Sequence, residues 1–316
     1  MDGTAPAGKP QRNWAKRGLG VVGVLAVLAG LYYAGGALWL HEIDDDPGFA
    51  QGVEVPENGS RAVAVAAALI DREVNVHRWV GNDPWFQPAA ILDNMPNFQA
   101  GIVAALSRFA IELTDQIARA RGTSQVDPDA DSAAGRLKYP GDVWIFEWSS
   151  TPVQPSSESQ YRKAIEDLRR YNDRLAAGNA SFERRSDNLM ATLERIAADI
   201  GGSSAALSQR IEDYGDAWID PAADDLFYAT KGRLYAYYLL LEALGVDYAG
   251  VLGERNVQRN WDEMLTSLRA ASTLAPWVVA NGELDGQSVP NHLAAQGFLL
   301  LRARFQLYEV INILLK

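Results

Sequence analysis

The sequence contains no cysteine, and this absence excludes disulfide bonds, thiolate catalysis and cysteine-ligated zinc or iron–sulfur centres. Histidine is almost as scarce: only His41, His77 and His292 occur, so a multi-histidine metal site would need nearly all of them. The sequence also lacks the G-x-S-x-G, P-loop, H-E-x-x-H and nucleotide-binding G-x-G-x-x-G patterns. We therefore expect no cofactor, no metal site and none of these standard catalytic sites.

Basic residues are in the minority. The chain has 29 Lys and Arg residues against 40 Asp and Glu residues, a formal net charge of −11, and four of the basic residues precede residue 18. An acidic surface repels phosphate backbones, so we expect no nucleic-acid partner. With 48% hydrophobic and 22% charged residues, the composition is otherwise that of a globular protein that buries a sizeable core.

Charged residues are missing from one long stretch, Gly18 to Leu40. As a helix this stretch would reach ~35 Å, enough to cross a hydrocarbon core of ~30 Å, so the lipid bilayer is an expected partner. Basic residues precede it and acidic residues follow it, and the positive-inside rule therefore predicts a single-pass protein with a cytoplasmic N-terminus. The predicted organisation is a cytoplasmic tail at 1–17, a transmembrane anchor at 18–40, a juxtamembrane linker at 41–59 and an exported helical domain at 60–316.

A cleaved signal peptide is the alternative for this stretch. The small residues Ala34-Gly35-Gly36 would allow cleavage before Ala37. The apolar run is longer than a usual signal-peptide core, and aromatic residues in its outer half suit a membrane interface, which favours an uncleaved anchor. Gly30 and Ala34 form a small-xxx-small pair, so the sequence also allows a homo-oligomer held by its anchors.

The rest of the chain is predicted to be all-α, an irregular helical bundle with one long aromatic and proline-rich loop. Apolar residues recur at spacings of three and four from Phe98 to Ile117, which indicates an amphipathic helix. Three prolines place the loop at Trp79 to Gln99. A final helix from His292 to Leu315 is apolar nearly all round, so we expect it at the centre of the bundle. Thr123 to Gly135 is predicted to be a polar loop, and the strand-like run Asp142 to Trp148 has no evident partner strand.

Four segments together resemble a known family. They are Asn82-Asp83-Pro84-Trp85-Phe86, Leu92 to Gln99, Lys138-Tyr139-Pro140-Gly141-Asp142-Val143-Trp144 and Leu300 to Gln306. The set is similar to the uncharacterised proteobacterial membrane-anchored proteins called domain of unknown function 2333, and the likeness covers nearly the whole chain beyond the apolar stretch. The resemblance implies a bacterial inner membrane and a periplasmic domain, and it brings no catalytic residues.

Paired carboxylates near aromatic side chains would suit a glycan hydrolase, and Asp83, Asp93 and Glu147 are the candidates. The structural alternative is stronger, because Asp before Pro or Asn is also common in turns and helix caps. Aromatic and amide side chains of the same region are candidate binding residues: Trp79, Asn82, Trp85, Asn94, Asn97 and Trp144.

Asp127, Asp129 and Asp131 alternate as at the start of a calcium loop. Ser132 and Lys138 stand where such a loop needs Gly and Glu, so a solvated acidic loop is the better interpretation. We expect a non-enzymatic interaction or scaffold protein of the cell envelope with a possible envelope protein as partner. The alternatives are an envelope glycan or peptidoglycan hydrolase and a module that binds a cation or small ligand.

Overall fold

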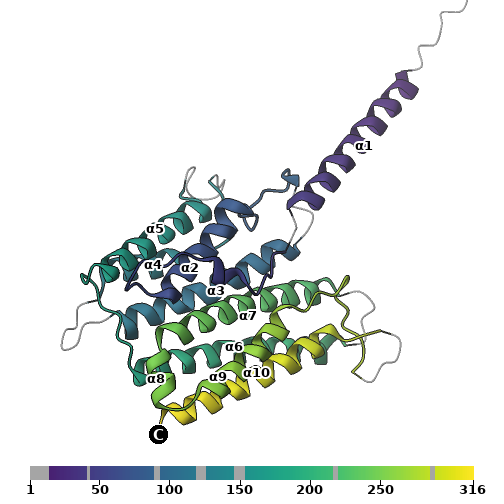
Figure 1. The fold of residues 1–316 in the computed structure, drawn as a ribbon. Helices are drawn as coiled ribbons and strands as arrows, with labels where there is room; N and C mark the ends of the chain where they lie inside the picture. Colours follow the sequence, from purple (N-terminus) through teal and green to yellow (C-terminus); the bar gives the residue numbers. More distant parts are fainter. Residues whose placement is uncertain are drawn as a thin grey trace, which may run out of the picture.

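A computed structural model describes residues 14–40, 43–88, 93–118, 126–145, 154–215, 220–284 and 289–316. In these ranges the chain is helical and forms no strand, with one long helix projecting from a helical body (Figure 1). The all-α prediction is therefore confirmed. The α-helices are α1 (Trp14–Leu40), α2 (Arg61–Asp71), α3 (Asn94–Glu112), α4 (Pro128–Leu137), α5 (Ser157–Ala176), α6 (Ser186–Tyr214), α7 (Pro221–Asp247), α8 (Ala249–Glu254), α9 (Gln258–Ser272) and α10 (His292–Leu314). Three short turns accompany them: a 3-10 turn at Phe49–Gly52 and π-helical turns at Arg72–Val76 and Leu113–Ile117.

Helix α1 is the apolar stretch found in the sequence. Its segment Arg17–Gly36 has a mean hydropathy of 1.8, and its side chains are exposed from Arg17 to Gly35 apart from a partly covered Tyr33. Length and composition allow this helix to cross a membrane, and a signal sequence would have the same properties.

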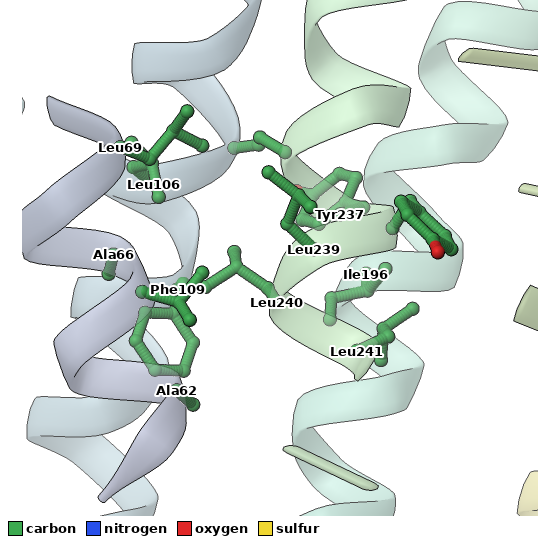
Figure 2. Packing of buried hydrophobic residues seen from close by; sticks show 14 of the residues in the cluster. Ala62, Ala66, Leu69, Leu106, Phe109, Ile196, Tyr237, Leu239, Leu240 and Leu241 are labelled. Atoms are coloured by element: carbon green, nitrogen blue, oxygen red, sulfur yellow. The ribbon is translucent and has the colours of Figure 1, made fainter. Parts of the chain in front are cut away.

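Helix α7 lies at the centre of the body. It packs against α2, α3, α6 and α9, and its buried residues cover most of its circumference. Figure 2 shows the resulting core, with side chains from α2, α3 and α6 meeting those of α7; the labelled residues are Ala62, Ala66, Leu69, Leu106, Phe109, Ile196, Tyr237, Leu239, Leu240 and Leu241. The most extensive of these contacts is with α3, where Gly101 and Gly232 bring the two backbones together.

Helix α10 is not central, contrary to the expectation from its apolar sequence. It packs on α6 and α9 with one face, and it lies along the outside of the body in Figure 1. The reason is that α7 already occupies the centre and offers α10 few contacts. Part of the apolar surface of α10 consequently remains in solvent.

The predicted polar loop Thr123 to Gly135 is also wrong in its second half, because α4 begins at Pro128. The Asp127 carboxylate caps this helix by accepting hydrogen bonds from the backbone of Asp129 and Ala130, and proline is favoured in a first helical turn. Asp127 and Asp129 both pair with Arg174 of α5, each at 2.7 Å. These acids therefore dock α4 on α5.

The segment after α1 is fastened to the body through backbone carbonyls and an acidic side chain. The carbonyl of Asp44 accepts from Arg72 and that of Asp46 from Tyr235, at 3.0 and 2.8 Å. Asp45 pairs with the buried ammonium of Lys231 at 2.7 Å. The body is consequently held close to the end of α1.

The strand-like run lies partly outside the described residues. Within them, 142–145 form a turn and an irregular stretch, and the carbonyl of Val143 accepts a hydrogen bond from the backbone of Ser157. This described part of the run packs on the start of α5 and forms no strand.

Candidate functional sites

Two of the candidate binding residues hold the structure together. Trp79 is 1% exposed, its indole donates to the carbonyl of Gly141 at 2.8 Å, and its ring meets the edge of Tyr161. The side-chain amide of Asn82 donates to the carbonyl of Val143 at 2.8 Å and to Glu158 at 2.9 Å. Both residues therefore fix the turn before α5 to the aromatic loop.

The three candidate catalytic carboxylates lie in different surroundings. Asp83 is nearly buried and pairs with the guanidinium of Arg78 at 2.7 Å. Asp93 is exposed and directly precedes α3. Glu147 lies outside the described residues. A glycosidase needs two carboxyl groups facing each other across the bond that is cleaved, and Asp83 and Asp93 are engaged with different partners.

Asp93 belongs to a carboxyl cluster with Asp224 and Asp225, which lie near the start of α7. Asn97 donates to Asp225 at 2.7 Å and to the carbonyl of Asp93 at 2.9 Å. Burial, followed by repulsion from Asp93 and Asp225, raises the pKa of Asp224 to about 6. Burial and the Asp93 carboxylate also raise the pKa of Asp225. In the described ranges no group of three His, Asp or Glu side chains has the geometry to hold a metal ion.

The predicted loop to Gln99 is too long, because α3 begins at Asn94 and so contains both Asn94 and Asn97. Asn94 bonds to the phenol of Tyr228 on α7, so both it and Asn97 connect α3 to α7. The sequence placed Asp93, Asn94 and Asn97 in one loop but gave no sign that α7 would face them. The only local signal was the Asp224-Asp225 pair shortly after Pro221.

The raised pKa of Asp224 predicts a pH-dependent stability. A carboxyl whose native pKa exceeds its unfolded value holds its proton more strongly when folded, so its contribution is present below pH 3.8 and is lost as the pH rises towards about 6. Asp224→Asn is therefore expected to stabilise the protein at pH 8 by about 1 kcal/mol, a value reduced for solvent screening, and to have little effect near pH 4. Urea unfolding across this pH range measures the difference.

Glu254→Gln, at an exposed position in α8, is the control for that measurement and should change stability by less than about 0.5 kcal/mol. A gain from Asp224→Asn that is the same at pH 4 and pH 8 would contradict the assignment.

The remaining candidate aromatics, Trp85 and Trp144, are brought together by Phe86. The Phe86 ring lies 5.8 Å from that of Trp85 and 5.9 Å from that of Trp144, both edge to face. Trp85 is 80% exposed and lies beside Tyr33 of α1. These three side chains form an aromatic cluster on the surface.

Helix α10 carries an exposed apolar stripe that the sequence analysis missed. Its members are Phe298, Leu301, Phe305 and Tyr308 of α10 and the C-cap residue Leu315, of which Phe305 is 65% exposed. Their spacings of three, four, three and seven place them on one helical face ~25 Å long. Arg302 and Asn312 are the polar exposed residues beside them. A groove of about 310 Å³ between α6 and α10 continues the apolar surface past Phe298 and Leu301 to Leu207 and Ile211.

A second groove, of about 730 Å³, separates the segment after α1 from α2 and α5. Its floor includes Ala64, Ala67 and Ala68 of α2, and charged residues such as Asp71 and Arg169 form its rim. Asp71 and Arg169 pair with each other at 2.8 Å. This pair joins α2 to α5 at the rim of the groove.

Comparison with known proteins adds a family assignment. No curated protein and no solved structure resembles the chain at a significant level. The family model described as "uncharacterized protein conserved in bacteria", domain of unknown function 2333, matches residues 56–217 and 216–314. These ranges include the segments on which the predicted resemblance rests and nearly all of the helical body. The chain therefore belongs to this bacterial family.

Proposed function

We propose that the protein is a membrane-anchored interaction protein of the bacterial cell envelope, and that the exposed apolar stripe of α10 binds a protein partner. Helix α1 crosses the inner membrane, the N-terminus is cytoplasmic and the helical body is periplasmic. This orientation is supported by the four basic residues before Gly18 and the acidic residues after Leu40.

The apolar stripe of α10 carries the proposal. Single exposed apolar residues are normal on a protein surface, but a contiguous row along one helix face marks an interaction site. The opposite face of α10 is already buried through residues such as Leu300, Leu307 and Leu314. The stripe is therefore additional to what the fold requires, and a second helix laid along it would bury it.

Replacing Phe305 by aspartate tests this surface. A photo-crosslinking amino acid at Leu301 in the full-length protein should join a discrete partner in membranes, and Phe305→Asp should reduce that product about tenfold, because an aromatic anchor commonly contributes more than ~1.4 kcal/mol to binding. Val246→Asp is the matched control, since Val246 is also an exposed apolar residue of a helix and lies outside the stripe.

The product identifies the partner: an adduct of twice the chain mass means a homo-oligomer, and a heavier or lighter adduct means another envelope protein. Equal crosslinking by wild type and Phe305→Asp, or no discrete product, would contradict a partner on α10.

The hydrolase and the cation-binding module have less support. The Asp83 carboxylate is neutralised by Arg78, and Asp93 belongs to the cluster with Asp224 and Asp225. The raised pKa of Asp224 makes this cluster a weaker ligand for cations at mildly acidic pH, because a metal must displace the proton that the carboxyl holds there. An interaction protein accounts for the α10 stripe, which neither alternative does.

A further inference from the structure

We propose that the aromatic loop is a membrane-contacting collar, in which Trp85 and Phe86 join Tyr32 and Tyr33 at the periplasmic interface of the inner membrane. The hydrocarbon-spanning part of α1 then ends near Tyr33 and not at Leu40. This inference rests on the proposed anchoring of α1 in the membrane and is independent of the partner of α10.

The aromatic loop is in direct contact with α1. The Tyr33 hydroxyl donates to the carbonyl of Trp85 at 2.9 Å, and that of Tyr32 donates to the carbonyl of Phe86 at 3.3 Å. One turn further along, Gly36 lies so close to Pro88 that a Cβ on the glycine would overlap with the proline ring. The body therefore begins to cover α1 at Tyr32, well before the helix ends.

The absence of water in the hydrocarbon core limits how deep in the bilayer these contacts can lie. Loop backbone is not tolerated in lipid hydrocarbon, because its polar groups lose their water there, so Trp85 and Phe86 cannot lie deep in the bilayer. Helix α1 from Trp14 to Tyr33 is ~29 Å long, which matches a hydrocarbon core of ~30 Å. Tyr33 then marks the outer boundary of that core, and the basic stretch before Gly18 marks the inner one, since long basic side chains reach the headgroups.

The exposed surface at this boundary has the chemistry of an interfacial belt. Tyr32 is 51% exposed and Phe86 is 45% exposed, and together with Trp85 they continue the lipid-facing surface of α1 onto the body. Rings that combine an apolar body with a polar edge, such as those of Trp and Tyr, favour the headgroup region. Packing of Phe86 on Trp144 ties the collar to the body. The collar consequently fixes how the body is oriented on the membrane.

Single-cysteine labelling tests the collar, and the natural absence of cysteine makes every label specific. Full-length Trp85→Cys carries a nitroxide and is reconstituted in vesicles of phosphatidylethanolamine and phosphatidylglycerol. Collision rates with oxygen, which concentrates in lipid, and with a water-soluble nickel chelate report the depth of the label. Leu25→Cys, within the lipid-facing part of α1, and Val246→Cys, at an exposed position before α8, are the two references.

We expect the oxygen-to-nickel collision ratio at position 85 to lie between the high value at 25 and the low value at 246. If the ratio at position 85 equals that at position 246 while the ratio at position 25 remains high, the collar is wrong and the membrane anchor is still supported. A low ratio at 25 as well would overturn the anchor, and with it the collar.

Discussion

Gly232→Ala is expected to destabilise the protein by about 3 kcal/mol, at the upper end of the cost of overpacking a core. A Cβ at this position in α7 would overlap with the carbonyl oxygen of Phe98 in α3, and a Cβ on Gly101 would overlap in the same way with the carbonyl of Ala229. Backbone atoms cannot rotate away as a side chain does, so α3 and α7 would have to separate. The cost is large because this crossing is the most extensive helix contact in the body.

Thermal or urea unfolding of the detergent-solubilised protein measures this effect. Gly250→Ala is the matched control: it lies in α8, where an added Cβ would meet no neighbouring atom within 4 Å, and alanine should stabilise that helix by up to ~1 kcal/mol. The close crossing would be refuted if both substitutions changed stability in the same direction.

Arg72→Met is expected to cost about 3–5 kcal/mol, because it leaves the Glu73 carboxylate buried without its counter-charge. Glu73 is 0% exposed, and its carboxylate lies 2.7 Å from the Arg72 guanidinium. Arg72 also donates to the phenol of Tyr235 at 2.9 Å and to the carbonyl of Asp44. One guanidinium thus connects the core to the segment after α1, and hydrogen exchange at residues 43–48 should rise in the variant.

The double variant Arg72→Met/Glu73→Gln separates charge from packing. It removes both charges while Gln99 retains the carbonyl oxygens of residue 73 and of Arg78 as acceptors, so it should recover about 2 kcal/mol of the loss. Equal instability of the single and double variants would show that the buried charge is not the cause.

Much of the fold could be predicted from local pattern. Periodic apolar residues gave the helix that begins near Phe98, and the structure places α3 at Asn94–Glu112. The sequence also contains a helix-start signal at Asp127-Pro128, a capping residue followed by a proline in the first turn. The high density of acidic residues around it suggested a loop instead. The candidate site residues were harder to interpret, because the carboxylates that surround Asp93 come from Asp224 and Asp225, which are remote in sequence.

By itself, the sequence determined the helical class, the apolar helix at the amino end and the family, because these depend on composition, spacing and short motifs. Tertiary structure alone decided which of two apolar helices is central, since α7 and α10 are similarly rich in leucine and only their neighbours distinguish them. It also decided that Trp79 is buried while Trp85 is exposed. The physical reason is that burial and pKa depend on which distant side chains surround a residue, and spacing along the chain does not encode that.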